Sequence, residues 1–517
     1  MSGMTPQDFN FPEKFASFRD IQLEAIPWAV LSDRRFRAGA LPVGSGKSAV
    51  AMAIAKHFNR TAILTVTKGL QKQYSSEFEP CGLVNIQGRT NYICDVADDC
   101  KQGGHLRCTS QRAGTCPYVQ KYEQAKAGDY LVTNYAYWLN VMNKGQGLGG
   151  FDCLILDEAH DSARALSSYL DFHISEAEVE RFALPSPKPC VEDLSLWSEW
   201  ARKADHALKA HLNTQRNPHH RALEAERLET LMDRLARLQT LTSENWVCEI
   251  SEGTKYGRFW KFECVWPGQY GELLFKGIPN VVLMSGTLRP SALGELGIKR
   301  SDCDFRSWPR IFPPNRAPFY HVKCVNVKYG LSGEQEQKWL DTIDRVIEGR
   351  YAQRKGIIHT VSYARQRLLL ERSRFRQYML ANSNDPDSEA ATEVVDRFRA
   401  AKAPAILVSP SFGTGWDFPG FDCEWQIVTN IPFPPMQSKV MKRRKELNPA
   451  YQAQQAAKEL AQFLGRPMRF EKDRAENFIV DDRIGWFVGM ARKFLPEDFT
   501  FNTVIDVPVP GPRWNER

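Results

Sequence analysis

The feature that most constrains the fold is a glycine-rich turn between a short apolar run and a helix of small residues. Residues 36–43 lead into the turn Pro42-Val-Gly-Ser-Gly-Lys-Ser48, and small residues favour a helix over 48–57. Glycines let the backbone curl so that several N–H groups face one anion, and the helix N-terminus adds a partial positive charge. The strict phosphate-loop pattern has a glycine where this chain has Leu41. The match is therefore partial, and a chance turn is the alternative.

Each residue at the centre of this turn has a predicted role towards a nucleotide. We expect Gly44, Ser45 and Gly46 to cradle phosphates with their backbone N–H groups. Lys47 would reach the β- and γ-phosphates, and the Ser48 hydroxyl would ligate Mg²⁺. The turn therefore predicts ATP and Mg²⁺ as ligands.

Short apolar runs alternate with helical segments along most of the chain. The runs that predict strands are residues 36–43, 62–66, 130–133, 153–156 and 281–284 in a first set, and 356–359, 405–408 and 426–429 in a second. Strands that alternate with helices are typical of a parallel sheet. Because 517 residues exceed what one core usually holds, we predict an α/β fold with two parallel-sheet lobes.

One apolar run ends in two acids, in the stretch Leu154-Ile-Leu-Asp-Glu-Ala-His160. A parallel strand would hold these acids at its C-terminal edge, where such sheets bind ligands. We expect Asp157 to hold Mg²⁺, directly or through water, and Glu158 to polarise the attacking water. His160 is a candidate for coupling this site to a bound strand. The alternative for each residue is a helix N-cap or a first-turn acid.

Composition is consistent with a cytosolic protein and leaves a nucleic-acid partner open. The net charge of +7, from 68 basic and 61 acidic residues, is an excess that many metabolic enzymes share. No apolar run reaches the length of a membrane span, and the N-terminus lacks a basic region followed by an apolar one. We therefore predict a cytoplasmic location and no membrane partner. The basic stretch Lys442-Arg443-Arg444-Lys445 is expected to be a solvated face.

Two segments interrupt the α/β pattern. Residues 88–120 are rich in Cys, Gly, Thr and Asp, whereas residues 162–245 are predicted to be mostly helical. The helical prediction rests on apolar residues at helical spacing, with charges between them. These residues are Leu228, Leu231, Leu235 and Leu238. The helical segment is either a substrate-gripping subdomain or a packing accessory.

Four of the twelve cysteines lie together between the turn and the acidic box. They are Cys94, Cys100, Cys108 and Cys116, with five, seven and seven residues between successive members. Structural zinc sites prefer closer cysteine pairs, and the ferredoxin spacings do not match. An iron–sulfur cluster, zinc and free thiols are the alternatives that the spacing leaves open.

Together, the turn and the acidic box resemble those of superfamily-2 helicases with a DEAH box, and more narrowly those of the XPD/DinG family. Residues 18–22 (FRDIQ) occupy the place of the family's adenine-contacting glutamine, which would be Gln22. Residues 284–288 (MSGTL) resemble the motif that links hydrolysis to strand movement, with Gly286 in place of the usual alanine.

The resemblance continues in the second set of strands. Residues 412–420 (FGTGWDFPG) resemble the family's motif V, and residues 462–469 (QFLGRPMR) resemble its Q-x-x-G-R-x-x-R motif VI. The nucleotide contacts that this resemblance implies are Gly415, Asp417 and Gln462. Arg469, together with Arg466, would neutralise charge on the transferring phosphoryl group.

The segments around the four cysteines, residues 88–94 and 116–118, resemble the borders of the family's [4Fe–4S] domain. The resemblance implies that Cys94, Cys100, Cys108 and Cys116 hold a [4Fe–4S] cluster with a structural role. It also implies that both motor lobes are RecA-like and that the helical segment is an Arch-like insertion. The implied domains are lobe 1 at 1–87, 126–161 and 263–290, the cluster insertion at 88–125, the Arch-like insertion at 162–262, and lobe 2 at 291–517.

The predicted function is that of an ATP-dependent DNA helicase that moves on single-stranded DNA and unwinds forked or overhang duplexes. The family implies 5′→3′ polarity. An RNA helicase or remodeller of the DEAH class is one alternative, and a nucleic-acid-binding or redox-sensing module with a defunct motor is another. The sequence predicts no particular protein partner.

Overall fold

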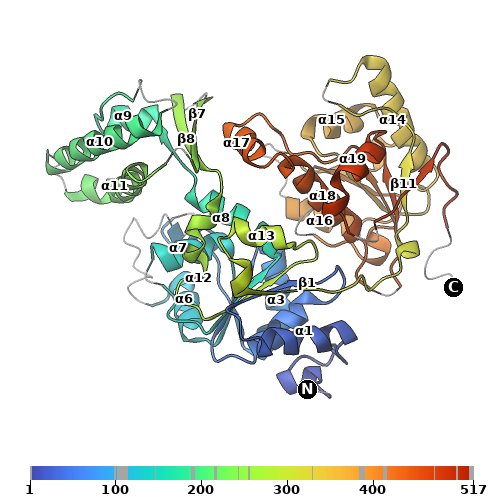
Figure 1. Cartoon of the computed structure of the whole chain (residues 1–517), viewed down its shortest axis with the longest axis horizontal. Helices are drawn as coiled ribbons and strands as arrows, with labels where there is room; N and C mark the ends of the chain where they lie inside the picture. The colour runs from blue at the N-terminus through green and yellow to red at the C-terminus, as the bar shows by residue number, and fades with distance from the viewer. Residues whose placement is uncertain are drawn as a thin grey trace. The chain divides into compact units, whose positions relative to one another are not determined.

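The computed structural model describes residues 3–511 apart from 98–99, 102–113, 146, 188–192, 215–217, 243, 254–256, 329, 384–390, 411–415, 471 and 497–498. The chain forms two compact units (Figure 1). The first unit comprises Met1–Gly39, Ser48–Arg306 and Pro435–Pro449, and the second comprises Ala40–Lys47, Ser307–Pro434 and Ala450–Arg517.

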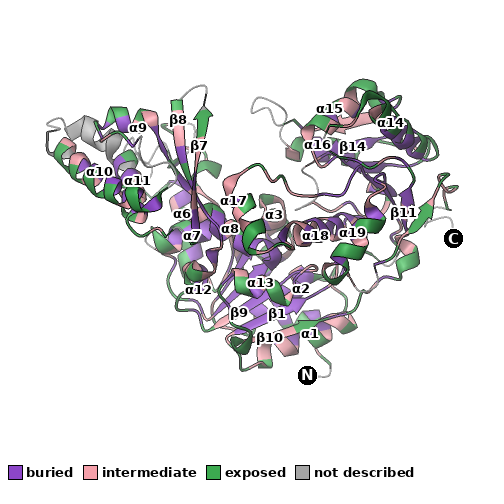
Figure 2. Cartoon of the chain, turned by 45° about the horizontal axis from the view of Figure 1, so that its top comes forward, coloured by how far each residue is buried: buried purple, intermediate pink, exposed green. Residues whose placement is uncertain are grey.

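The first unit is built on a seven-stranded sheet in the order β10-β1-β9-β5-β2-β4-β3. The strands are β1 (Phe36–Ala40), β2 (Thr61–Thr65), β3 (Leu83–Asn85), β4 (Tyr130–Asn134), β5 (Cys153–Asp157), β9 (Asn280–Met284) and β10 (Cys303–Ser307). The pairings from β1 across to β3 are all parallel. Strands β1, β2 and β5 are buried along their whole length, as expected of a parallel sheet covered on both faces (Figure 2).

The register of this sheet brings the turn and the acidic box to one edge. Gly39 of β1 pairs with Met284 of β9, and Met284 pairs with Asp157 of β5. Because the three strands are parallel, the segments that follow them leave the sheet at its C-terminal edge, where ligands bind in such folds. The sheet also extends beyond residue 290, the predicted end of lobe 1, because β10 joins it as an edge strand.

Helices connect these strands. They are α1 (Asp20–Leu31), α2 (Lys47–Ala55), α3 (Lys68–Phe78), α6 (Pro117–Ala127), α7 (Tyr135–Asn143), α8 (Ser162–Leu170), α12 (Glu272–Phe275) and α13 (Pro290–Glu295). Among the residues that the structure describes, no helix is both long and apolar enough to cross a membrane.

The segment predicted to be mostly helical, residues 162–245, also contains one strand, which joins a small sheet with two strands that follow the segment. The helices are α9 (Glu176–Arg181), α10 (Leu194–Thr214) and α11 (Pro218–Leu238), and the strands of the sheet are β6 (Phe172–Ser175), β7 (Trp246–Gly253) and β8 (Gly257–Cys264). The strands are antiparallel in the order β6-β8-β7. The four leucines predicted to share a helix face are all buried. Trp197, fully buried on α10, meets Phe262 of β8 edge to face with ring centroids 4.9 Å apart.

The basic stretch at 442–445 is only partly a solvated face. It lies in α17 (Lys439–Leu447), which packs against β7 and belongs to the first unit. Arg444 donates to the carbonyls of Val265 and Cys264 at 2.8 and 3.0 Å, and its guanidinium lies over the Trp266 ring. An arginine stem and head that satisfy carbonyls and cover an indole are structural, so for this residue the expectation of a solvated face was wrong.

The second unit contains a seven-stranded sheet in the order β13-β14-β12-β15-β16-β11-β17, with every pairing parallel. Its strands are β11 (Phe319–Val322), β12 (Gly356–His359), β13 (Met379–Ala381), β14 (Ile406–Ser409), β15 (Trp425–Val428), β16 (Glu476–Ile479) and β17 (Asn502–Val504). Its helices are α14 (Gly333–Glu348), α15 (Tyr363–Arg372), α16 (Ala391–Ala400), α18 (Tyr451–Gly465) and α19 (Ile484–Ala491). The prediction of two parallel-sheet lobes is confirmed.

Candidate nucleotide site

The glycine-rich turn has the backbone that a phosphate cradle requires. Gly44 and Gly46 have φ of +79° and +73°, in the left-handed region that glycine adopts without strain. A Cβ on Gly44 would also lie 2.3 Å from the Phe312 ring, so the close approach excludes any larger residue. Ser45 is fully buried, and Lys47 is buried as the first residue of α2. The predicted phosphate-binding residues therefore form one tight turn at a helix N-terminus.

The acidic box and the turn meet at a buried tyrosine that the sequence analysis did not single out. The Tyr74 hydroxyl, on α3, donates to Oδ2 of Asp157 at 2.8 Å, and the nearby Ser48 side chain acts on the same phenol by lowering its pKa. The other Asp157 oxygen accepts from the backbone N–H of Glu158 at 2.9 Å. The two predicted Mg²⁺ ligands thus lie beside one hydroxyl, and their hard oxygen atoms are the donors that Mg²⁺ prefers.

Burial determines the chemistry of this cluster. Asp157 is 1% exposed and Tyr74 is fully buried. Burial, reinforced by the Asp157 charge, raises the pKa of Tyr74 well above its usual value, so the phenol stays protonated and donates to the carboxylate. A second buried tyrosine, Tyr135, donates instead to the backbone carbonyl of Asp157 at 3.2 Å. Tyr74 and the Glu158 backbone therefore hold the two carboxylate oxygens of Asp157, and Tyr135 holds its backbone, before any nucleotide binds.

Glu158 and His160 connect the acidic box with the strand-coupling motif on β9. Nδ1 of His160 lies 2.5 Å from the Ser285 hydroxyl, which also bonds Oε2 of Glu158 at 3.2 Å. The backbone N–H of Thr287 donates to the same hydroxyl at 3.3 Å. Glu158 has φ of +49°, which is costly for a residue with a side chain and is often found where function requires it. Ser285 is thus a second residue whose role the sequence alone did not reveal.

Gln22, the predicted adenine contact, is the third residue of α1. Its side-chain oxygen accepts from the backbone N–H of Arg19 at 2.9 Å, which caps α1. The residue is 6% exposed. This contact fixes the amide's orientation and gives Gln22 a structural role that is compatible with the predicted one.

The two candidate arginines of the second unit bind an acid of their own lobe. Arg469 makes an ion pair with Asp417, and Nη1 of Arg466 lies 3.6 Å from the same carboxylate. Arg466 also donates to the Trp416 carbonyl at 2.8 Å. Motifs V and VI are therefore joined through Asp417, the residue predicted to contact nucleotide.

A second acid, Asp473, holds the loop that carries Arg469. The carboxylate of Asp473 accepts from the backbone N–H groups of Arg469 and Phe470, each at 2.6 Å, and from that of Gly420 at 3.0 Å. Gln462 lies buried on α18. Gly415 lies outside the described residues.

Three of the four clustered cysteines are within the described residues. Sγ of Cys100 and Sγ of Cys116 lie 3.6 Å apart, and both residues are buried. Burial, then the neighbouring Cys116 and Cys94 thiols, raise the pKa of Cys100 to about 12. Closely spaced thiolates repel each other, so their ionisation calls for a bound cation. Cys108 lies outside the described residues, and among those described no set of three potential ligands is arranged to hold a metal ion.

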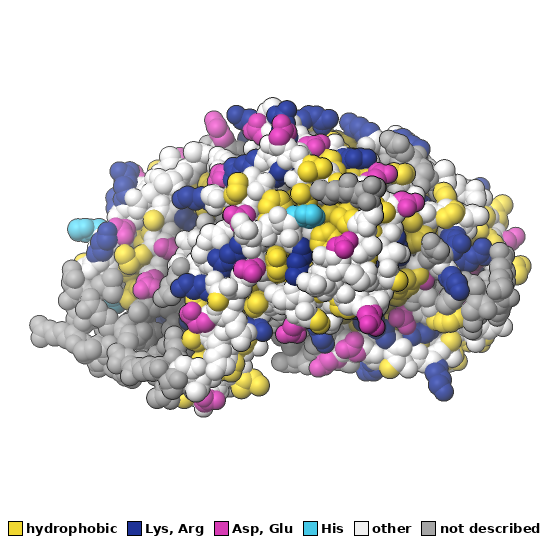
Figure 3. Space-filling view, turned by 90° about the horizontal axis from the view of Figure 1, so that it is seen from below, with side chains coloured by type: hydrophobic (Ala, Val, Ile, Leu, Met, Phe, Trp, Pro, Cys, Tyr) yellow, Lys and Arg dark blue, Asp and Glu magenta, His cyan; other side chains and the backbone are white. Residues whose placement is uncertain are grey.

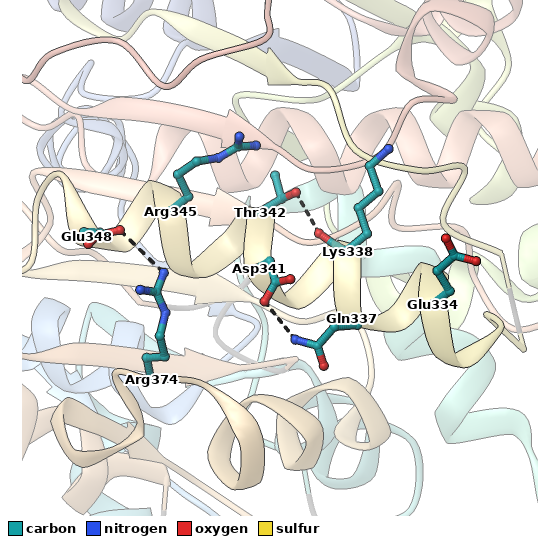
Figure 4. Close-up of a pocket in the computed structure, with 8 residues that line it drawn as sticks. All are labelled: Glu334, Gln337, Lys338, Asp341, Thr342, Arg345, Glu348 and Arg374. Carbon is teal, nitrogen blue, oxygen red and sulfur yellow. Dashed lines mark hydrogen bonds and ion pairs between the residues drawn. The ribbon is translucent and has the colours of Figure 1, made fainter.

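A hollow on the surface of α14 carries none of the predicted site residues (Figure 4). Its polar side chains satisfy one another: Gln337 donates to Asp341 at 2.8 Å, and Arg374 lies 3.5 Å from Glu348. This mutual pairing is typical of a solvated helix face.

Comparisons with known proteins agree with this geometry. A DEAD/DEAH box helicase model matches residues 19–181, and a helicase C-terminal domain model matches residues 352–497. A solved structure described as "XPD_Helicase" is 14% identical, with a TM-score of 0.61, over 94% of this chain and all of that one. The S. tokodaii Xpd4 structure is 15% identical, with a TM-score of 0.56, over the same shares.

A further structure, S. cerevisiae Dbp5 bound to RNA and ADP BeF3, is 11% identical, with a TM-score of 0.50, over 97% of this chain and 95% of that one. At these identities the structural likeness shows the fold, whereas the two family models mark the helicase domains in the sequence. The chain contains a DEAD/DEAH box helicase domain followed by a helicase C-terminal domain, and its fold resembles that of the XPD structures.

Proposed function

We propose that the chain is an ATP-dependent DNA helicase that moves 5′→3′ along single-stranded DNA and unwinds forked or overhang duplexes. The ATP-dependent part of this proposal is supported by one observation. The side chains of Asp157 and Ser48 both lie beside the Tyr74 hydroxyl. A motor without catalytic function would have no need to keep two cation ligands oriented inside its core, where unpaired polar groups are costly.

The residues of the site divide the work of hydrolysis between them. The backbone N–H groups of the turn and the Lys47 ammonium would bind the phosphates, while Ser48 and Asp157 would hold Mg²⁺. Bound Mg²⁺ would neutralise charge that develops on the phosphate oxygens. Glu158 would orient the attacking water and accept its proton.

Hydrolysis would be coupled to the strand through the second acid of the box. Glu158 shares the Ser285 hydroxyl with His160, so a movement of the 284–288 motif changes the position of the group that orients the water. This link supports a motor in which strand binding and hydrolysis depend on each other.

A DNA substrate is favoured by the likeness to XPD structures together with the cysteine group between the two nucleotide motifs. Basic and acidic side chains are interspersed on the face shown in Figure 3. We expect individual lysines and arginines to bind the phosphates of a nucleic-acid strand. Binding should therefore weaken as salt rises, because each phosphate contact releases a condensed counterion.

An RNA helicase is the second candidate, since an RNA-bound Dbp5 structure shares the fold. The experiment that separates the two uses DNA and RNA duplexes that carry either a 5′ or a 3′ single-stranded overhang. The proposal predicts ATP-dependent unwinding of 5′-overhang DNA. Unwinding of RNA alone would replace the proposal by its alternative, and unwinding of 3′-overhang DNA would reverse the polarity.

We also propose that Cys94, Cys100, Cys108 and Cys116 hold a [4Fe–4S] cluster. The convergence of the Cys100 and Cys116 sulfurs, with Cys94 acting on the same thiol, supports a shared metal centre. Protein purified without oxygen should be brown and contain about four irons per chain. Cys108→Ser should lose the iron while the matched change Cys303→Ser, outside the group, should keep it. Zinc without iron in the wild-type protein would contradict the assignment.

A further inference from the structure

Tyr74 occupies a position that hydrophobic packing alone does not explain. Its ring lies against Phe78 on the buried face of α3, with ring centroids 6.1 Å apart. A phenylalanine would fill the same space. The hydroxyl, however, donates to the Asp157 carboxylate at 2.8 Å, and the Ser48 side chain is near enough to lower the pKa of the phenol.

The neighbouring Tyr135 shows what a purely structural hydroxyl looks like in this core. It is also buried, and it satisfies its hydroxyl on the backbone carbonyl of Asp157 at 3.2 Å. A carbonyl is a sufficient acceptor for a buried phenol. Tyr74 instead donates to the carboxylate of Asp157, a residue that would ligate the cation, and lies near Ser48, the other such residue of the same unit.

We propose that Tyr74 is a positioning residue for the divalent cation that accompanies the nucleotide. Its hydroxyl orients the Asp157 carboxylate and the Ser48 hydroxyl towards a common point and so sets the affinity of the site for the cation. The proposal rests on the proposed ATP-binding function and names a residue outside the nucleotide motifs as a determinant of cation binding. Tyr74 touches neither substrate nor reacting atoms and acts through Asp157 and Ser48.

The test is a titration of Mg²⁺ against binding of a fluorescent ATP analogue by the full-length chain. Tyr74→Phe keeps the ring and removes only the oxygen. Because hydrogen bonds to buried charged groups are the strong ones, the Mg²⁺ concentration that gives half-maximal binding should rise at least about tenfold. Affinity for the analogue in excess EDTA should stay within about twofold of the wild type, since the phosphate cradle is untouched.

Tyr135→Phe is the matched control, because it deletes a buried hydroxyl that bonds the same residue but not its carboxylate. Its half-saturating Mg²⁺ concentration should equal that of the wild type. ATP turnover at saturating Mg²⁺ should be nearly restored in Tyr74→Phe, as expected for a residue that positions rather than reacts.

Three outcomes would overturn the proposal. They are an unchanged Mg²⁺ requirement in Tyr74→Phe, equal shifts in both phenylalanine variants, and a Tyr74→Phe chain that fails to fold, which would assign the hydroxyl to folding. A wild-type chain that binds no ATP analogue would remove the proposed function itself, and that result is seen before any variant is made.

Discussion

The acidic box of the first lobe and the arginine loop of the second differ in what their charges face. Asp157 is held by hydrogen-bond donors, from Tyr74 on one oxygen and from the Glu158 backbone on the other. Arg466 and Arg469 face the carboxylate of Asp417, so their charge is offset within their own lobe.

This difference means that the acid and the arginines are held differently before a nucleotide binds. The acid site is preorganised, because both carboxylate oxygens of Asp157 are already oriented by hydrogen-bond donors. The two arginines are instead engaged with Asp417, and a guanidinium in an ion pair must leave its partner before it can neutralise a phosphoryl group. We therefore expect the ion pair with Asp417 to open before either arginine can act on a phosphoryl group.

The largest effect on ATP turnover should follow from removing Arg469, the arginine expected to neutralise charge on the transferring phosphoryl group. Arg469→Ala should lower ATP turnover by about 10³-fold or more, the range known for arginines that stabilise phosphoryl transfer. Binding of the ATP analogue should change far less. Lys472→Ala, an exposed basic residue of the same loop, is the control. Steady-state hydrolysis measures both, and equal losses in the two variants would assign Arg469 to folding.

Glu158→Gln should affect hydrolysis by about 10²-fold or more and leave nucleotide binding in place, because the amide keeps the hydrogen bond to Ser285 but cannot accept a proton. The variant should accumulate as an ATP-bound complex in single-turnover experiments. Parallel loss of binding and hydrolysis would show that the residue is structural.

Asp417→Asn tests directly whether Asp417 competes with phosphate for the two arginines, and its expected effect is smaller. Removing the acid's charge frees both arginines, so the apparent affinity for the ATP analogue should rise by several-fold, equivalent to about 1 kcal/mol. Equilibrium binding of the labelled analogue gives the number. If affinity falls instead, Asp417 contacts the nucleotide, as its motif implies, and the competition between acid and phosphate is refuted.

The last prediction concerns the stability of the second lobe and its dependence on pH, not ATP turnover or nucleotide affinity. His359 is fully buried in the second lobe, stacks on Phe463 of α18 at 4.3 Å, and hydrogen-bonds Gln426 at 3.1 Å. Burial lowers the pKa of His359 from its usual 6.5 to about 4. The unfolded chain therefore binds a proton that the folded lobe rejects. The stabilising contribution is complete above about pH 6.5 and is lost as the pH falls towards 4, by about 3 kcal/mol in all.

Chemical denaturation at a series of pH values checks this expectation. His359→Gln should be less stable near neutral pH but should lose less stability between pH 6.5 and 4 than the wild type. An equally steep decline in both proteins would mean that other groups govern the acid sensitivity of the second lobe.

The sequence predicted the strands with the strongest apolar runs. The runs at 153–156 and 356–359 became β5 and β12 within a residue of their expected ends. Short edge strands such as β13 and β17 were missed, because three residues at a sheet edge carry little pattern. The sequence also did not predict that α17 belongs to the first unit, although segments of the second unit precede and follow it in the chain. Contacts such as those of Arg444 depend on tertiary structure.

Candidate residues of the site could be proposed from sequence motifs, whereas the partners that packing supplies could not. Lys47, Asp157 and Glu158 were proposed from their motifs, and their roles stay predictions. Tyr74 was not proposed, although its place on the buried face of α3, three residues after the buried Gln71, signals a phenol that needs an internal partner. The ion pair of Arg469 with Asp417 joins two motifs 52 residues apart in the chain, and no local pattern reveals such a contact.

The central claim is that the glycine-rich turn and the acidic box form an ATP-hydrolysing site that responds to a nucleic-acid strand. The most direct test measures ATP hydrolysis with and without a single-stranded DNA oligonucleotide, in the wild type and in Lys47→Ala. The account predicts that the strand stimulates the wild type and that Lys47→Ala stays inactive at every strand concentration. Hydrolysis by Lys47→Ala above about a tenth of the wild-type rate would contradict the account.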